Sequence, residues 1–81
     1  MNLDISPTAH DLLRSIRQRI DPRALVVARS VDDHERMKTV RYWTLDIGGI
    51  WKILAPAHRC AGRRVERALS KFLRDAEETR P

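Results

Sequence analysis

The residues that come closest to a chemical site are the acidic group Asp-Asp-His-Glu at positions 32–35. Carboxylate oxygens and imidazole nitrogens are common metal ligands. Neighbouring side chains of an extended segment point in opposite directions, so four adjacent residues rarely converge on one ion. The sequence supplies no second group of ligands to support them. We therefore expect Asp32, Asp33, His34 and Glu35 to form a charged loop without a bound metal.

A second group consists of His58 and Cys60, with Arg59 between them. Nearby cations would favour the Cys60 thiolate. A nucleophile also needs a positioned base, and a side chain two residues away points elsewhere on a helix. A zinc site would need more ligands, and Cys60 is the only cysteine of the chain. The sequence therefore predicts a non-enzymatic protein with no metal and no cofactor.

Recognition of an anionic partner is a better-supported chemistry than catalysis, because cations recur along one segment. We call the following residues the basic row: Arg59, Arg63, Arg64, Arg67, Lys71 and Arg74. Like charges four residues apart on a helix repel by about 0.2–0.5 kcal/mol per pair. This cost favours an anionic counterpart: the acidic loop of this chain or of a second copy, an acidic patch on another protein, or phosphate. A solvated helix face without any partner is the alternative interpretation.

Aromatic side chains are the other candidate contacts, and they are Tyr42, Trp43 and Trp51. If these side chains are exposed, they would anchor a partner protein or a second subunit, or stack on nucleic-acid bases. Tryptophans of so small a domain more often belong to the core.

Two helices are expected to flank the remaining elements. Ser6 is a favourable cap and Pro7 a favourable first residue for a helix over 7–20, which the Asp21-Pro22 pair ends. Pro56 is expected to open the last helix, over about 57–78, because apolar residues there recur at helical spacing. Positions 79–81 form a polar tail.

Three short segments rich in β-branched residues are expected between the helices, at about 23–31, 38–47 and 50–54. Gly48 and Gly49 separate the last two and favour a hairpin turn. The sequence therefore predicts one small α+β domain over 1–81 in α-β-β-β-α order. Its small antiparallel sheet is packed by the N-terminal helix and by the long amphipathic C-terminal helix.

Both faces of the first two strands are fairly apolar, whereas two helices can cover only one of them. The second face would then be exposed unless it contacts a partner or a second copy of the chain. We therefore expect a homodimer or a binding surface there.

Composition limits the choice of partner and compartment. The formal net charge is +5, from 16 Lys and Arg against 11 Asp and Glu. A basic domain suits nucleic acid, an anionic membrane or an acidic protein. No apolar stretch approaches the roughly 20 residues of a membrane span, and the N-terminus lacks a signal-peptide pattern. We expect a cytoplasmic protein without a membrane partner.

These observations favour a small regulatory protein that acts by binding another protein, in the manner of inhibitors that phages and mobile elements direct against host proteins. The alternative is a basic nucleic-acid-binding accessory protein, whose affinity would fall steeply with salt.

Overall fold

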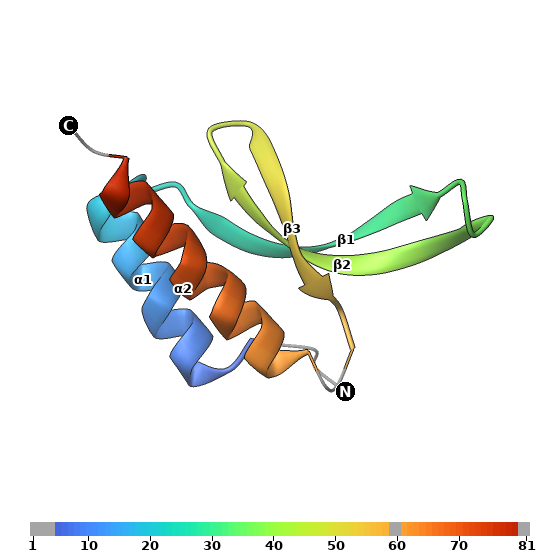
Figure 1. The fold of residues 1–81 in the computed structure, drawn as a ribbon, viewed down its shortest axis with the longest axis horizontal. Helices are drawn as coiled ribbons and strands as arrows, with labels where there is room; N and C mark the ends of the chain where they lie inside the picture. Colours follow the sequence, from blue (N-terminus) through green and yellow to red (C-terminus); the bar gives the residue numbers. More distant parts are fainter. Residues whose placement is uncertain (1–4, 59–60, 80–81) are drawn as a thin grey trace.

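Five elements follow one another in the computed structural model, which describes residues 5–58 and 61–79. Their order, α-β-β-β-α, confirms the predicted fold (Figure 1). The elements are α1 (Pro7–Arg19), β1 (Leu25–Asp33), β2 (Lys38–Ile47), β3 (Ile50–Pro56) and α2 (Gly62–Glu78).

The first helix begins as its sequence indicates. The Ser6 side chain accepts a hydrogen bond from the Ala9 backbone N–H at 3.2 Å and so caps α1. Pro7 occupies the first turn, where its missing N–H removes no helical bond. Ala9, Leu13 and Ile16 form the buried stripe of the helix. α1 ends at Arg19, one residue before the expected end.

The three strands form an antiparallel meander in the order β1-β2-β3. Gly48 and Gly49 join β2 to β3 with φ angles of +58° and +83°, as a two-residue hairpin turn requires. The β2–β3 register contains one irregularity. Trp43 pairs with Ala55 while Thr44 pairs with Ile53, so Leu54 is an extra, bulged residue.

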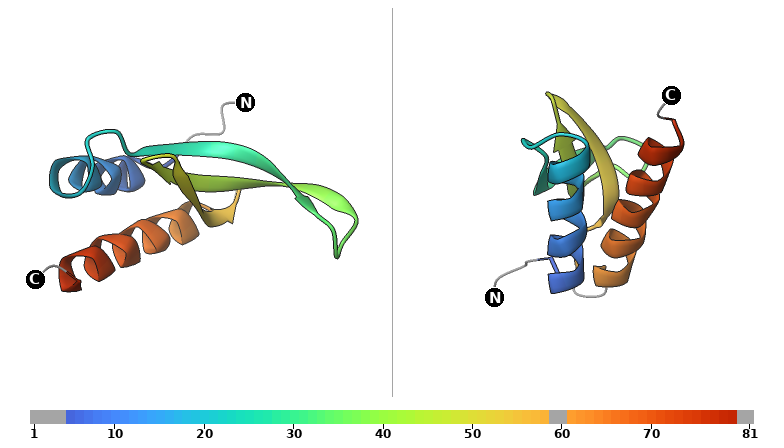
Figure 2. Two further views of the ribbon diagram at one scale, coloured as in Figure 1. Left: turned by 90° about the horizontal axis from the view of Figure 1, so that it is seen from above. Right: turned by 90° about the vertical axis from the view of Figure 1, so that its left-hand side faces the viewer.

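β1 and β2 continue beyond the rest of the fold. β3 pairs only with residues Tyr42–Ile47 of β2, so the distal part of the β1–β2 hairpin is a two-stranded arm. Figures 1 and 2 show this arm projecting away from both helices. The acidic group at 32–35 lies at the end of the arm.

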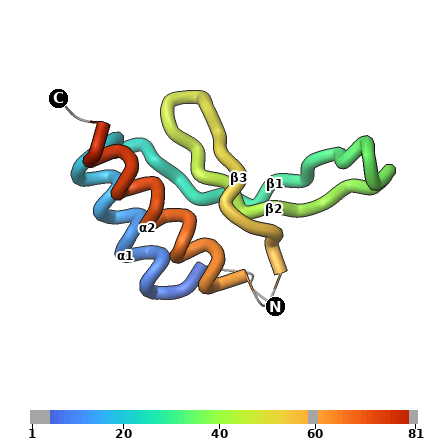
Figure 3. Tube along the Cα trace, viewed as in Figure 1, coloured from blue at the N-terminus to red at the C-terminus, as the bar shows by residue number. Residues whose placement is uncertain are grey.

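α2 packs against β3 and runs alongside α1 (Figures 2 and 3). Trp43 and Leu45 of β2 belong to one core cluster with buried residues of both helices. The buried residues of the hydrophobic core are Ala9, Leu13, Ile16, Ala24, Trp43, Leu45, Ala55, Ala61, Val65 and Leu69. Trp43 is only 9% exposed. The candidate partner contact at Trp43 is therefore a core residue.

The expected start of the last helix was wrong. Pro56 ends β3, and α2 starts at Gly62 with Ala61 as its cap residue. The strand continues past Leu54 because Ala55 is buried opposite Trp43. The Ala57 N–H then donates to the Arg41 carbonyl oxygen at 2.9 Å, which holds the chain against the sheet.

β1 is also displaced from its expected range by two residues at each end. The strand extends to Asp33 because its last residues pair with Thr39 and Lys38 of β2. The Thr39 hydroxyl donates to the Asp32 carboxylate at 3.0 Å and reinforces that end of the ladder. Of the expected polar tail, Thr79 caps α2 and positions 80–81 lie outside the described residues.

Candidate binding surfaces

The sheet face turned away from the helices carries apolar side chains in contact with solvent, as expected. We call it the helix-free face, and the strand register defines it by Leu25, Val27, Arg29, Tyr42, Thr44, Asp46, Trp51 and Ile53. Leu25 is 52%, Ile53 45% and Trp51 43% exposed. Large apolar groups are thus available for contact on this face.

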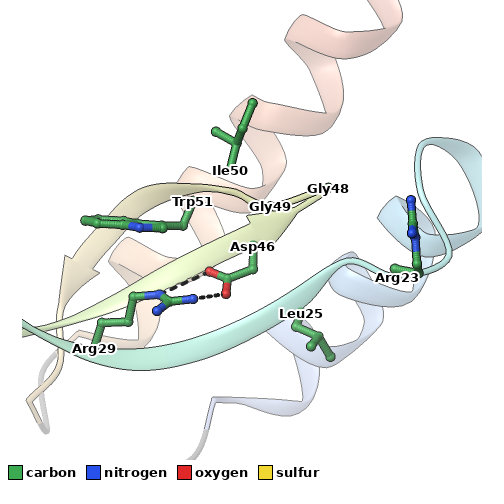
Figure 4. Close-up of a pocket in the computed structure, with 8 residues that line it drawn as sticks. All are labelled: Arg23, Leu25, Arg29, Asp46, Gly48, Gly49, Ile50 and Trp51. Carbon is green, nitrogen blue, oxygen red and sulfur yellow. Dashed lines mark hydrogen bonds and ion pairs between the residues drawn. The ribbon is translucent and has the colours of Figure 1, made fainter.

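A polar cluster occupies the middle of the helix-free face (Figure 4). The Arg29 guanidinium forms an ion pair with the Asp46 carboxylate, and its Cζ lies 5.6 Å from the centroid of the Trp51 ring. The buried Thr44 hydroxyl lies 3.1 Å from the Val27 carbonyl oxygen and 3.2 Å from Asp46 Oδ1. Of these contacts, the Arg29 guanidinium over its ring restrains the Trp51 side chain on this face.

Strand alternation separates the aromatic candidates. Tyr42 and Trp43 are adjacent in β2, so their side chains lie on opposite faces. Tyr42 is half-buried on the helix-free face, together with the more exposed Trp51. Two of the three aromatic candidates therefore share a surface.

The basic row is the second candidate surface. Arg63, Arg64, Arg67, Lys71 and Arg74 are all exposed on α2, whereas Arg59 lies outside the described residues. Among residues 5–58 and 61–79, none of these five cations forms an ion pair.

Two acidic residues of α2 point away from the row and contact α1. Glu66 Oε1 accepts a hydrogen bond from the Ser6 hydroxyl at 3.0 Å. Glu77 forms an ion pair with Arg19 near the other end of the helix pair. Glu66 and Glu77 therefore hold the two helices together, whereas the cations of α2, and Asp75 and Glu78 at its C-terminal end, are exposed.

The cations near α1, which could have extended the row, have contacts of their own. Arg14 lies 3.3 Å from the Asp11 carboxylate, and Arg23 lies 3.6 Å from that of Asp21. Arg17 Nε donates to the Ala24 carbonyl oxygen at 2.8 Å and braces the connection into β1. Like Arg19, they take part in intramolecular structure, which distinguishes them from the row.

The acidic loop does not neutralise the row within one molecule. Asp33 lies 3.6 Å from Arg36, and Asp32 accepts from Thr39. Both sit at the end of the projecting arm, away from α2 (Figure 1). The counterparts that remain for the row are the acidic loop of a second copy, an acidic patch on another protein, and phosphate.

Beside the row lies a shallow depression that the sequence did not indicate. We call it the α2–β3 groove, and it is lined by Leu54, Arg64, Arg67, Ala68 and Lys71. Nearby, Lys52 Nζ lies 6.0 Å from the centroid of the Phe72 ring. Strand alternation along β3 places Lys52 and Leu54 on the side that faces α2, and this alternation can be read from the sequence. Their closeness to the basic row depends on how α2 packs against β3, which the sequence does not show.

The residues considered for catalysis and metal binding do not gather. Within the described ranges, no three His, Cys, Asp or Glu side chains are grouped to hold a metal ion. Cys60 lies outside those ranges, and His58 is exposed. No described helix is both long and apolar enough to cross a membrane.

No protein-family model matches the chain, and comparisons with curated proteins and with solved structures found no match.

Proposed function

We propose that this chain is a small, non-enzymatic regulatory protein that acts by binding another protein. The observation that carries the proposal is the run of exposed cations on α2 that form no ion pair within the described residues. Glu66 and Glu77 are engaged with α1, while Arg63, Arg64, Arg67, Lys71 and Arg74 have no anionic partner in the described structure. A surface with unbalanced charge beside apolar groups is suited to a complementary protein surface.

The mechanism we propose is steric. A non-enzymatic domain of this size would act by covering part of its partner, and Arg and Trp side chains commonly contribute most to such binding. Arg63 and Arg67 on the row, and Trp51 on the helix-free face, are the anchors we favour. Inhibition of a host protein by a phage or a mobile element is the biological role that this mode of action fits.

A capture experiment tests the proposal. Tagged protein is incubated with nuclease-treated lysate, and the retained proteins are compared for wild type and the R63E/R67E variant. The K38E/R41E variant is a matched control, because it changes net charge equally at exposed positions of the arm. We expect one protein to be retained by wild type and by the control and lost with R63E/R67E. If all three proteins retain the same partner equally, the basic row is not the binding surface.

Nucleic-acid binding is the second candidate function, and the length of the row supports it. Arg63 and Arg74 are eleven residues apart, which is about 16 Å along a helix. A row of that length can contact several phosphates. This candidate requires recovery that nuclease abolishes, and affinity that falls steeply with salt because bound counterions are released.

A further inference from the structure

The α2–β3 groove combines positive charge with accessible apolar surface, and the combination narrows the chemistry of its ligand. We propose that the groove binds an acidic segment of a partner protein. An apolar side chain of that segment would cover Leu54 and Ala68, while its carboxylates would lie beside Arg64, Arg67 and Lys71. The inference rests on the proposed function, since it names the partner chemistry of a protein-binding surface.

The floor of the groove is built by two particular residues. Leu54 follows Lys52 by two residues in β3, so strand alternation places it on the side of the sheet that faces α2. Ala68 is too small to fill the space beside it on α2. Both residues remain partly accessible. An apolar side chain of a ligand can therefore bury surface against this floor, and the gain in affinity grows with the apolar area removed from water.

The cationic side of the groove has regular spacing. Arg64, Arg67 and Lys71 are three and four residues apart, so they lie along one side of α2 over about 10 Å. Carboxylates on successive turns of a helix, or on alternate residues of a strand, repeat over comparable distances. Each guanidinium can also hold a carboxylate with two parallel hydrogen bonds.

Apolar surface continues beyond the groove towards the β2–β3 turn. A neighbouring depression is lined mainly by Leu45, Ile47, Ile50, Trp51 and Phe72, with Lys52 as its cation. A nucleic-acid backbone would neutralise the cations but would offer no apolar side chains to cover this surface. A peptide with both acidic and apolar residues satisfies the two requirements together, and for that reason we favour it over phosphate.

The test is a titration of the isotope-labelled full chain, followed by amide and methyl NMR signals. The main probe is a synthetic peptide of repeated Glu-Glu-Leu-Leu units. Matched probes replace Leu with Ser or Glu with Lys, and a DNA duplex is the phosphate probe. We expect the main probe to shift the signals of Leu54, Ala68 and Lys71, and its Ser version to bind roughly tenfold more weakly. The Lys version should not bind.

The R64E/R67E variant should lose at least roughly tenfold in affinity for the main probe, whereas K38E/R41E should match wild type. Amide spectra of each variant establish that it is folded. Three results would each overturn the inference. The first is that the main probe shifts none of these signals, the second is that its Ser version binds equally tightly, and the third is that DNA shifts the same signals with higher affinity. A lysate partner that survives nuclease and is retained by R64E/R67E would overturn the groove assignment and leave the proposed function standing.

Discussion

The repulsion within the basic row should lower the free energy of unfolding of the free protein. The R63E variant, which places an acid at one position of the row, measures this loss of stability. Arg63 lies in the first turn of α2, where the structure has no acidic residue and Ala61 provides no side-chain cap. A cation there opposes the helix dipole by about 0.3–1 kcal/mol. Arg63 also repels Arg67, four residues later, by about 0.2–0.5 kcal/mol.

Glutamate at position 63 reverses both effects. It complements the dipole, and it forms a favourable pair with Arg67 in the better orientation, with the acid N-terminal to the base. Allowing for the solvent exposure of both side chains, we expect a net gain of roughly 1 kcal/mol. For a domain of 60–100 residues this raises Tm by about 4–8 °C. The gain should shrink strongly between roughly 0.01 M and 1 M salt, because the interactions lie at the surface.

Thermal unfolding followed by circular dichroism at low and high salt provides the measurement. R14E is the matched control: it makes the same charge change on a helix surface but replaces a contact with Asp11 by repulsion. The control should lose a few tenths of a kcal/mol. If R63E leaves Tm unchanged or lowers it at low salt, with the helix content retained, the row does not strain the free protein. The charges of the row would then give the free protein no reason to favour an anionic partner.

Three further predictions concern the core, the turn and the helix-free face. L69A should lower the free energy of unfolding by about 2–5 kcal/mol in urea titrations, because Leu69 is fully buried between the helices and the sheet; a loss as small as that of L25A, at an exposed position, would contradict the packing. G49A should cost roughly 1–2 kcal/mol, since a Cβ at φ +83° meets no atom and the strain is that of the backbone alone; an unchanged Tm would contradict the turn. If a second copy covers the helix-free face, light scattering at high micromolar concentration should show a dimer that I53K disrupts, and a monomeric wild type would refute that arrangement.

The order and type of the elements could be predicted because their signals are local. Ser6 and Pro7 mark the start of α1, and Gly48 with Gly49 marks the β2–β3 turn without reference to distant parts of the chain. The start of α2 could not be predicted in this way. Pro56 fits a helix start in sequence, but the pairing of Ala55 with Trp43 keeps the chain in the sheet.

The candidate surfaces were only partly predictable for the same reason. Helical spacing places the cations of α2 on one side, and the structure agrees. Whether they are neutralised depends on contacts between distant segments, such as Glu66 with Ser6. Alternation separates Tyr42 from Trp43 but does not say which of them meets the helices. Packing buries Trp43, and the contact of α2 with β3 brings Leu54 beside the row.

Solubility alone does not account for the arrangement of charge on α2. A net positive charge keeps a protein in solution wherever the cations lie, and the arm and the sheet offer other exposed positions. Arg29 and Arg36 on those segments have acidic neighbours, as do Arg14 and Arg19 on α1. On the outer side of α2, five cations repeat at three- and four-residue spacing with no ion pair among the described residues. That spacing raises the free energy of the folded chain. Binding of an anionic segment removes the repulsion, so the same residues that weaken the free domain would favour its complex.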